Sequence, residues 1–126
     1  MTNLTQFENQ AYLSLETFRK NGAGIPTPVW FAQSGSVFYV STFVNSGKVK
    51  RIQNNPSVRI NPCGMQGELM GQWVTSSAHV ADSQEAQAAE AALDEKYGEQ
   101  RREFMRKSPL PVEQRAYLVI LATITP

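Results

Sequence analysis

Reactive side chains are scarce in this chain of 126 residues, which contains one cysteine, Cys63, and one histidine, His79. A single cysteine cannot form a disulfide within the chain, so nothing indicates an oxidising compartment. Metal sites made of His and Cys, Ser-His-Asp triads and Cys-His pairs all need more of these residues than the chain provides. We therefore interpret Cys63 and His79 as structural, with a ligand contact as the alternative for His79. Any enzymatic chemistry is expected to come from a bound cofactor.

Long hydrophobic runs and a strong net charge are absent as well. No apolar run approaches the roughly 18 residues of a membrane span, and the polar start MTNLTQFENQ lacks the charged and apolar regions of a signal peptide. A formal net charge of +1 argues against the broad basic face that a nucleic-acid backbone requires. With 41% hydrophobic and 18% charged residues, the sequence predicts one folded cytoplasmic domain over residues 1–126, binding neither membranes nor nucleic acid.

The first half of the chain carries the pattern of antiparallel strands. Residues 12–18 alternate with the strand period and precede Asn21-Gly22, a strong hairpin signal. IPTPVWFA and VFYVSTF follow with the turn QSGS between them, so residues 12–43 predict a three-stranded meander. SVRINPC and GQWVTSSAHVAD predict two more strands, joined through GMQGEL. The closing AYLVILATIT is almost entirely apolar, which is typical of a central strand buried on both faces.

Helical periodicity replaces the strand pattern late in the chain. Ser83 is a favourable N-cap, and Leu93 and Tyr97 lie on an apolar stripe that continues until Gly98 interrupts the helix. Residues 99–107 predict a second short helix, and we interpret the many acidic residues of this region as a solvated face. Six strands with late helices predict an α+β fold built around a small, closed or nearly closed antiparallel barrel.

A short basic helix is predicted for the stretch SGKVKRIQNNP. Ser46 is a favoured N-cap and the proline at the end is a natural stop. Lys48, Lys50 and Arg51 nevertheless place cations near the positive end of the helix dipole, which costs a few tenths of a kcal/mol to about 1 kcal/mol each. Free amides, a hydroxyl and two or three cations in one place suit a phosphate group. The alternative is a solvated basic helix that binds no ligand.

These residues also carry a family resemblance. SGKVKRIQNNPSV resembles the Ser-Arg-Lys segment, followed by Asn-Asn-Pro, of the pyridoxamine 5'-phosphate oxidase family of flavin-binding split barrels. YLSLETFRKNG, TPVWF, SGKVKRI, PC and EKYG, in this order, are similar to the small deazaflavin-dependent members of that family. The likeness extends from residue 12 to the last strand. It implies a six-stranded split barrel that forms a homodimer, with the cofactor site at the subunit interface.

The resemblance further implies a phosphate site at the basic helix. Ser46 and Lys48 match the positions that hold the cofactor phosphate in the family, and Lys50 and Arg51 are expected to reinforce them. The family's neighbouring arginine is replaced by Gly47, so one phosphate contact must come from elsewhere or be absent.

The other matched positions are one more phosphate contact and the segment along which the flavin ring lies in the family. The phosphate contact is Thr42, and the ring segment is Thr27, Pro28, Val29 and Trp30, with Gln72 as a weaker ring contact. Pro26 and Pro28 lack backbone donors, so this strand cannot be paired normally on both sides, which leaves backbone available to a ligand. No catalytic residue and no metal ligand is assigned.

Two functions follow as hypotheses. The first is an oxidoreductase that moves a hydride between bound FMN or a deazaflavin coenzyme and a small organic substrate. The deazaflavin is favoured because its long phosphorylated tail suits several cations and because Gly47 replaces the family's arginine. The second is a non-enzymatic protein that binds, stores or senses a flavin or another phosphorylated ligand. Oxidation of pyridoxamine phosphate itself is not expected, because the sequence ends at LATITP without the substrate-binding segment of the larger oxidases.

Overall fold

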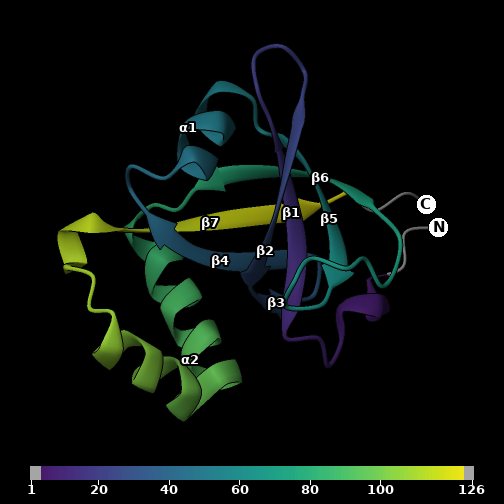
Figure 1. Cartoon of the computed structure of the whole chain (residues 1–126). Coiled ribbons are helices and arrows are strands. Elements are labelled where there is room, and N and C mark those ends of the chain that lie inside the picture. The colour runs from purple at the N-terminus through teal and green to yellow at the C-terminus, as the bar shows by residue number, and fades with distance from the viewer. Residues whose placement is uncertain (1–3, 124–126) are drawn as a thin grey trace.

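The computed structural model describes residues 4–123, and its strands form one antiparallel sheet (Figure 1). The strands are β1 Tyr12–Phe18, β2 Gly24–Trp30, β3 Ala32–Ser34, β4 Val37–Phe43, β5 Ser57–Cys63, β6 Val74–Val80 and β7 Arg115–Ala122. The helices are the α-helices α1 Gly47–Asn54 and α2 Ser83–Lys107 and the short 3-10 helices η1 Thr5–Phe7 and η2 Val112–Gln114. The α+β class expected from the sequence is therefore present.

The strand order β2-β1-β5-β6-β7-β4-β3 determines which elements meet. The sheet curls into a half-barrel, so that the edge strand β2 returns to contact β4 although the two are far apart in the order. β7 pairs with β6 on one side and β4 on the other, which confirms its expected central position. In Figure 1, α1 lies near the turn end of the β1–β2 hairpin, and α2 lies on the opposite side of the sheet.

The inside of the half-barrel is filled by one apolar cluster to which η1, α1 and most strands contribute. Its buried members are Phe7, Leu13, Leu15, Phe31, Phe38, Val40, Val49, Ile52, Val58, Ile60, Val74, Ala78, Ala116, Leu118 and Ile120. Each fully buried large side chain contributes about 1.5–3 kcal/mol relative to exposure. A smaller cluster joins Ala89 and Leu93 of α2 to Ala32 and Tyr117 on the other face of the sheet. The two clusters hold α1 and α2 on opposite faces.

The sheet has seven strands rather than the expected six, because the segment expected to form one strand is broken at Phe31. β2 pairs with β1, whereas β3 pairs with β4 at the other end of the sheet order. The buried Phe31 sits between the two ladders and takes its partners from α2. Its N–H donates to the Tyr97 hydroxyl at 2.9 Å, and its carbonyl accepts from Lys96 Nζ at 2.8 Å. These side-chain partners satisfy the backbone groups that the strand ladder leaves unpaired.

The helix starts agree with the sequence in one case and correct it in the other. Ser46 caps α1, because its hydroxyl accepts the Val49 N–H at 3.2 Å. The N-cap of α2 is Asp82 and not Ser83. The Asp82 carboxylate accepts the Glu85 N–H at 2.8 Å, and the Glu85 carboxylate accepts the Asp82 N–H at 3.0 Å. This reciprocal capping box satisfies two donors at once, which a serine one residue later does not achieve.

The interruption expected at Gly98 is confirmed. Gly98 has φ 53° and ψ −124°, in the left-handed region that favours glycine, and residues 99–107 then continue as a second helical segment. Figure 1 shows α2 bending sharply so that its second half folds back beside the first. Ion pairs join the halves, Arg101 to Glu90 at 2.6 Å and Arg102 to Asp94 at 3.1 Å. Within residues 4–123, no helix is long and apolar enough to cross a membrane.

Candidate functional site

The first turn of α1 has backbone donors that the fold does not use. Ser46 is buried, and its hydroxyl is occupied by the helix cap. None of the backbone hydrogen bonds among residues 4–123 uses the N–H groups of Gly47 or Lys48. The first N–H groups of a helix have no partner within the helix and carry its partial positive charge. The start of α1 is therefore able to donate hydrogen bonds to an anion.

Lys48 adds a cation that its surroundings do not neutralise. Its side chain is half-buried; burial lowers the pKa of the ammonium group, and the nearby Arg51 guanidinium lowers it further. In the part of the chain that the structure describes, Lys48 has neither an ion pair nor a side-chain hydrogen bond. A partly buried charge without a partner is unfavourable. A bound anion would supply the missing partner.

Arg51 folds back over Gly47. Its Nε donates to Oγ1 of the buried Thr17 in β1 at 2.6 Å. A Cβ atom at residue 47 would lie 2.7 Å from Nη1 of Arg51, so the glycine leaves the space that this guanidinium fills. Lys50, in contrast, is exposed. The structure thus gathers Ser46, Gly47, Lys48 and Arg51 at the start of α1 and leaves Lys50 on the outer surface.

β2 lies at an edge of the sheet, as its prolines predict, and pairs only with β1. Thr27 and Val29 are half-buried and Pro28 is exposed, so the strand presents one face to the barrel and one to solvent. The Trp30 ring stacks on the Tyr97 ring of α2, with 4.6 Å between centroids and 12° between planes. Trp30 is therefore backed by α2, and Pro28, Val29 and Trp30 together form one wall of a cavity.

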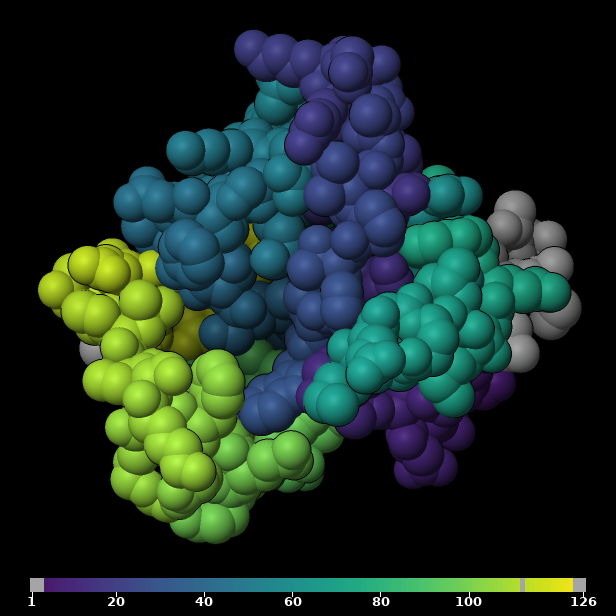
Figure 2. All heavy atoms as spheres, viewed as in Figure 1, coloured from purple at the N-terminus to yellow at the C-terminus, as the bar shows by residue number. Residues whose placement is uncertain are grey.

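Two adjoining cavities connect this wall to the end of β4. The first, of about 450 Å³, is lined by Tyr12, Pro28, Val29, Trp30, Ser41, Leu93, Arg101, Phe104 and Met105. The second, of about 340 Å³, is lined by Ser41, Thr42, Phe43, Phe104, Met105, Ser108, Pro109, Leu110 and Arg115. They share Ser41, Phe104 and Met105, and we call them together the β2–β4 groove. Figure 2 shows the surface recessed between the β1–β2 hairpin, the α1 region and the second half of α2.

The groove runs toward the start of α1. β4 passes directly into the helix, and the Ser46 N–H donates to the Phe43 carbonyl at 3.0 Å. The residues at the β2 end are mainly apolar and aromatic, and the buried Arg101 there is held by both carboxylate oxygens of Glu90, at 2.6 and 2.8 Å. Arg115 lines the second cavity, whereas Lys48, five residues after the end of β4, lines neither cavity. The groove therefore has an apolar β2 end without free charge, and the end of β4 leads from it to the cation and the free donors at the start of α1.

Comparison with known proteins identifies the fold. No protein-family model and no curated protein matches the sequence. Three solved structures illustrate the matches that do occur. An F420 reductase is 20% identical with a TM-score of 0.63, covering 98% of this chain and 97% of its own. A proposed pyridoxamine 5'-phosphate oxidase from Listeria innocua is 14% identical with a TM-score of 0.63, covering 96% and 90%. The haem storage protein HutZ from Vibrio cholerae is 17% identical with a TM-score of 0.70, covering 94% and 85%.

The chain has the pyridoxamine 5'-phosphate oxidase-like split-barrel fold. The family resemblance read from the motifs therefore agrees with the architecture. At these identities the likeness concerns the fold, so the roles of individual residues rest on the geometry of this split barrel.

One matched residue of the split barrel lies apart from the groove. Gln72 is exposed, and its backbone is fixed by the Gln6 side chain, which accepts the Gln72 N–H at 2.9 Å and donates to its carbonyl at 3.0 Å. Gln72 lines neither of the two groove cavities. Of the matched residues, Thr42, Pro28, Val29 and Trp30 line the groove, whereas Thr27 and the matched residues of the α1 start do not.

Sequence reasoning missed the part of the groove that α2 supplies. Phe104 and Met105 lie beyond the bend at Gly98 and line both cavities, and Tyr97 backs Trp30. The signal that the sequence offers is Gly98 itself, because a glycine directly after an aromatic residue on the apolar stripe marks where the helix turns back.

The scarce reactive residues lie outside the groove. Cys63 is buried, and burial raises the pKa of its thiol. His79 on β6 pairs with Glu85 of α2, with 2.8 Å between His79 Nε2 and Glu85 Oε2. These surroundings agree with structural roles for both.

Proposed function

We propose that the protein binds FMN or a deazaflavin coenzyme in the β2–β4 groove and transfers a hydride between this cofactor and a small organic substrate. The observation that carries the proposal is the half-buried Lys48 ammonium, which has no partner within residues 4–123 and adjoins two unused N–H groups. A cation next to free amides at a helix start suits a phosphate group. The F420 reductase and the proposed pyridoxamine 5'-phosphate oxidase among the similar structures support this choice.

Different residues would hold the phosphate and the ring of the cofactor. Ser46, Gly47 and Lys48, with Arg51 folded over the glycine, would hold the phosphate, and Thr42, which lines the groove, would add a contact. The edge strand from residue 27 to residue 30 would align the ring. A bound flavin-type cofactor supplies the hydride chemistry, while the chain binds it, orients it and limits the access of water.

The identity of the cofactor is a separate step of the proposal. FMN has one terminal phosphate, for which Lys48 and Arg51 suffice, whereas a deazaflavin with a longer phosphorylated tail would also employ the exposed Lys50. We therefore favour the deazaflavin. Calorimetric titration with each cofactor distinguishes them. We expect tighter binding of the deazaflavin in the natural protein, and the difference should shrink in Lys50→Ala.

We also propose that the protein is a homodimer with the cofactor site at the subunit interface. Phe43 and Phe104 line the groove but are 48% and 58% exposed, and such large apolar side chains are typical of surfaces covered by a partner. Light scattering should therefore give twice the mass of 14.0 kDa. A stable monomer that still binds the cofactor would contradict both the dimer and the shared site.

The second candidate function is binding or storage without turnover. Two observations favour it. The one ionised side chain that lines the groove beside the ring segment, Arg101, is already paired with Glu90, and the similar structures include haem storage and haem-binding proteins. The wall of the groove thus offers orientation rather than an acid or a base.

Electron transfer separates the two functions. The protein loaded with cofactor is reduced photochemically without oxygen and mixed with menadione, and reoxidation is followed by absorbance. An oxidoreductase should reoxidise faster than the same concentration of free cofactor, because the groove orients both reactants. Tight binding with no acceleration by a panel of quinone and nitroaromatic acceptors supports the storage function. Absence of binding by FMN and by the deazaflavin overturns the proposal.

A further inference from the structure

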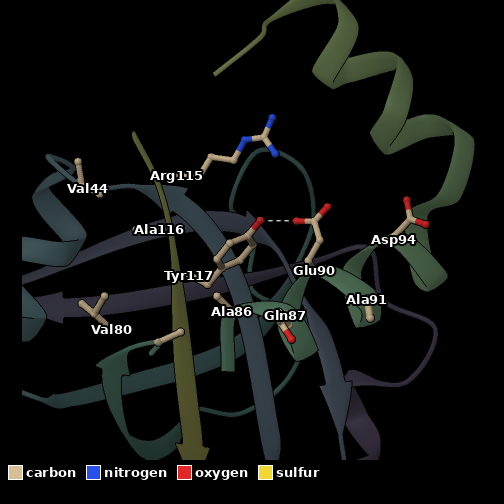
Figure 3. Close-up of a pocket in the computed structure, with 11 residues that line it drawn as sticks. Val44, Val80, Ala86, Gln87, Glu90, Ala91, Asp94, Arg115, Ala116 and Tyr117 are labelled. Carbon is tan, nitrogen blue, oxygen red and sulfur yellow. Dashed lines mark hydrogen bonds between the residues drawn. The ribbon is translucent and has the colours of Figure 1, made fainter. Parts of the chain in front are cut away.

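A larger cavity is lined by other residues of α2 than those that line the β2–β4 groove (Figure 3). It has a volume of about 930 Å³ and is bounded by the first half of α2 and by the ends of β6 and β7. We call it the α2 cavity, and its lining residues are Val44, Val80, Ala81, Ala86, Gln87, Glu90, Ala91, Asp94, Arg115, Ala116 and Tyr117. None of the residues matched to cofactor binding is among them.

The apolar part of this cavity is formed by short side chains. Ala86 and Ala91 project from α2, and Val80, Ala81 and Ala116 come from the sheet and the residue that follows β6. Such side chains leave space between the helix and the sheet that longer ones would fill. A volume of this size is within the range of small-molecule sites, which are mostly apolar with a few polar groups that fix orientation.

The two carboxylates of the α2 cavity already have partners. Both oxygens of Glu90 accept hydrogen bonds from Arg101, at 2.6 and 2.8 Å, and the Tyr117 hydroxyl donates to Glu90 as well. Asp94 accepts from Nη1 of Arg102 at 3.1 Å. Neither carboxylate is therefore left free to attract a cation.

Arg115 is the charged group of the cavity that lacks a carboxylate partner. Its Nε donates to the Leu110 carbonyl at 3.0 Å, and its two terminal nitrogens have no partner among the described residues. Figure 3 shows the Arg115 guanidinium on the same side of the cavity as the Tyr117 hydroxyl and the Glu90 carboxylate. Of the three charged side chains that line the cavity, Glu90, Asp94 and Arg115, only Arg115 forms no ion pair among the described residues.

We infer that the α2 cavity binds a small monoanion with a compact apolar body, such as a medium-chain or aromatic carboxylate. The terminal nitrogens of Arg115 form the fork that binds a carboxylate through two parallel hydrogen bonds. The alanine and valine side chains would contact the apolar body. Lys48 and the ring segment do not line this cavity. Arg115 lines both this cavity and the second cavity of the β2–β4 groove, so the alanine methyl groups, which line the α2 cavity and not the groove, distinguish the two sites.

Three probes of equal chain length and different charge test the inference: octanoate, octan-1-ol and octylammonium. Each is titrated into protein whose alanine methyl groups are isotopically labelled, so that NMR locates the site. We expect the methyl signals of Ala81, Ala86, Ala91 and Ala116 to move together with octanoate. Octanoate should bind at least tenfold more tightly than octan-1-ol, and octylammonium more weakly still. Equal affinity for the acid and the alcohol, or shifts confined to alanines outside the cavity, would overturn the inference.

Two variants sharpen the test. Arg115→Gln should weaken octanoate binding at least fivefold and leave the affinity for octan-1-ol unchanged. The control is Arg106→Gln, because Arg106 pairs with Glu99 and Glu103 outside the cavity; it should change neither affinity. Ala86→Phe fills the cavity from the helix side and should abolish the binding of both probes. Octanoate bound as tightly by Arg115→Gln or by Ala86→Phe as by the natural protein would show that this cavity is not the site.

Discussion

Replacement of Lys48 by methionine separates cofactor binding from stability. Methionine keeps an apolar side chain of similar length, so the packing of the stem is retained while the charge is lost. Hydrogen bonds to charged groups contribute about 1.5–3 kcal/mol, and about 1.4 kcal/mol corresponds to tenfold in affinity. We therefore expect Lys48→Met to bind the phosphorylated cofactor about tenfold to a hundredfold more weakly.

The stability of the cofactor-free protein should change in the opposite direction. Lys48 is a half-buried cation near the positive end of the α1 dipole, and Arg51 is a like charge beside it. A cation at a helix N-terminus costs about 0.3–1 kcal/mol, and its removal should raise the melting temperature by about 1–4 °C. The contrast between weaker binding and higher stability is specific to a cation held in place for a ligand.

The assay pairs calorimetric titration of the cofactor with thermal unfolding of the cofactor-free protein. The matched control is Lys107→Met, because the Lys107 side chain is 76% exposed at the end of α2 and lies 4.0 Å from Glu103. Both binding and melting should be nearly unchanged in the control. If Lys48→Met binds the cofactor as tightly as Lys107→Met, the start of α1 is only a solvated basic surface, and the reasoning from its unpaired charge is refuted.

Three further variants test the fold that supports the groove. Tyr97→Phe removes the hydroxyl that pairs with the backbone of the buried Phe31, so urea unfolding should show a loss of about 1–3 kcal/mol; an unchanged midpoint would mean that water replaces the hydroxyl. Asp82→Ala removes the cap of α2 and should cost about 1 kcal/mol by the same assay. Arg101 lowers the pKa of Glu90 to about 2, so the carboxylate stabilises the fold above its ordinary pKa of 4.5 and loses this effect as pH falls toward 2. The stability gap between the natural protein and Glu90→Gln should therefore narrow from pH 6 to pH 2.5, and a constant gap would contradict it.

The elements that the sequence predicts well are those determined by neighbouring residues. The hairpin at Asn21-Gly22 and the cap and stop of α1 depend on a few adjacent positions. The break at Phe31 could not be found in this way, because its backbone partners Lys96 and Tyr97 lie 65 and 66 residues away. The N-cap of α2 is a different case. Asp82 and Glu85 have the spacing of a capping box, so the sequence itself contains the signal that favours Asp82 over Ser83 as the N-cap.

The two ends of the candidate site also differ in how well neighbouring residues predict them. The phosphate end is local, since Ser46, Gly47, Lys48 and Arg51 fall within one short helix and its cap. The opposite wall of the groove comes from residues after the bend at Gly98, and the pattern of the helix shows that it is interrupted but not where the second half lies. Ion pairs between the two halves of α2 determine where the second half lies. The sequence does not show which charged residues of a helix pair with each other across such a bend.

The break in the sheet and the bend in α2 together explain why this fold has a groove. A continuous second strand would need no partners from α2, whereas the interrupted one takes Lys96 and Tyr97, which stacks on Trp30. The first half of α2 is thereby fixed against the ring segment. The second half, returned by Gly98 and tied to Glu90 through Arg101, places Phe104 with its ring centroid 5.7 Å from that of Trp30. Because Glu90 also accepts from Tyr117 in β7, one carboxylate couples the groove wall to the sheet and forms part of the α2 cavity, so its replacement should disturb both sites.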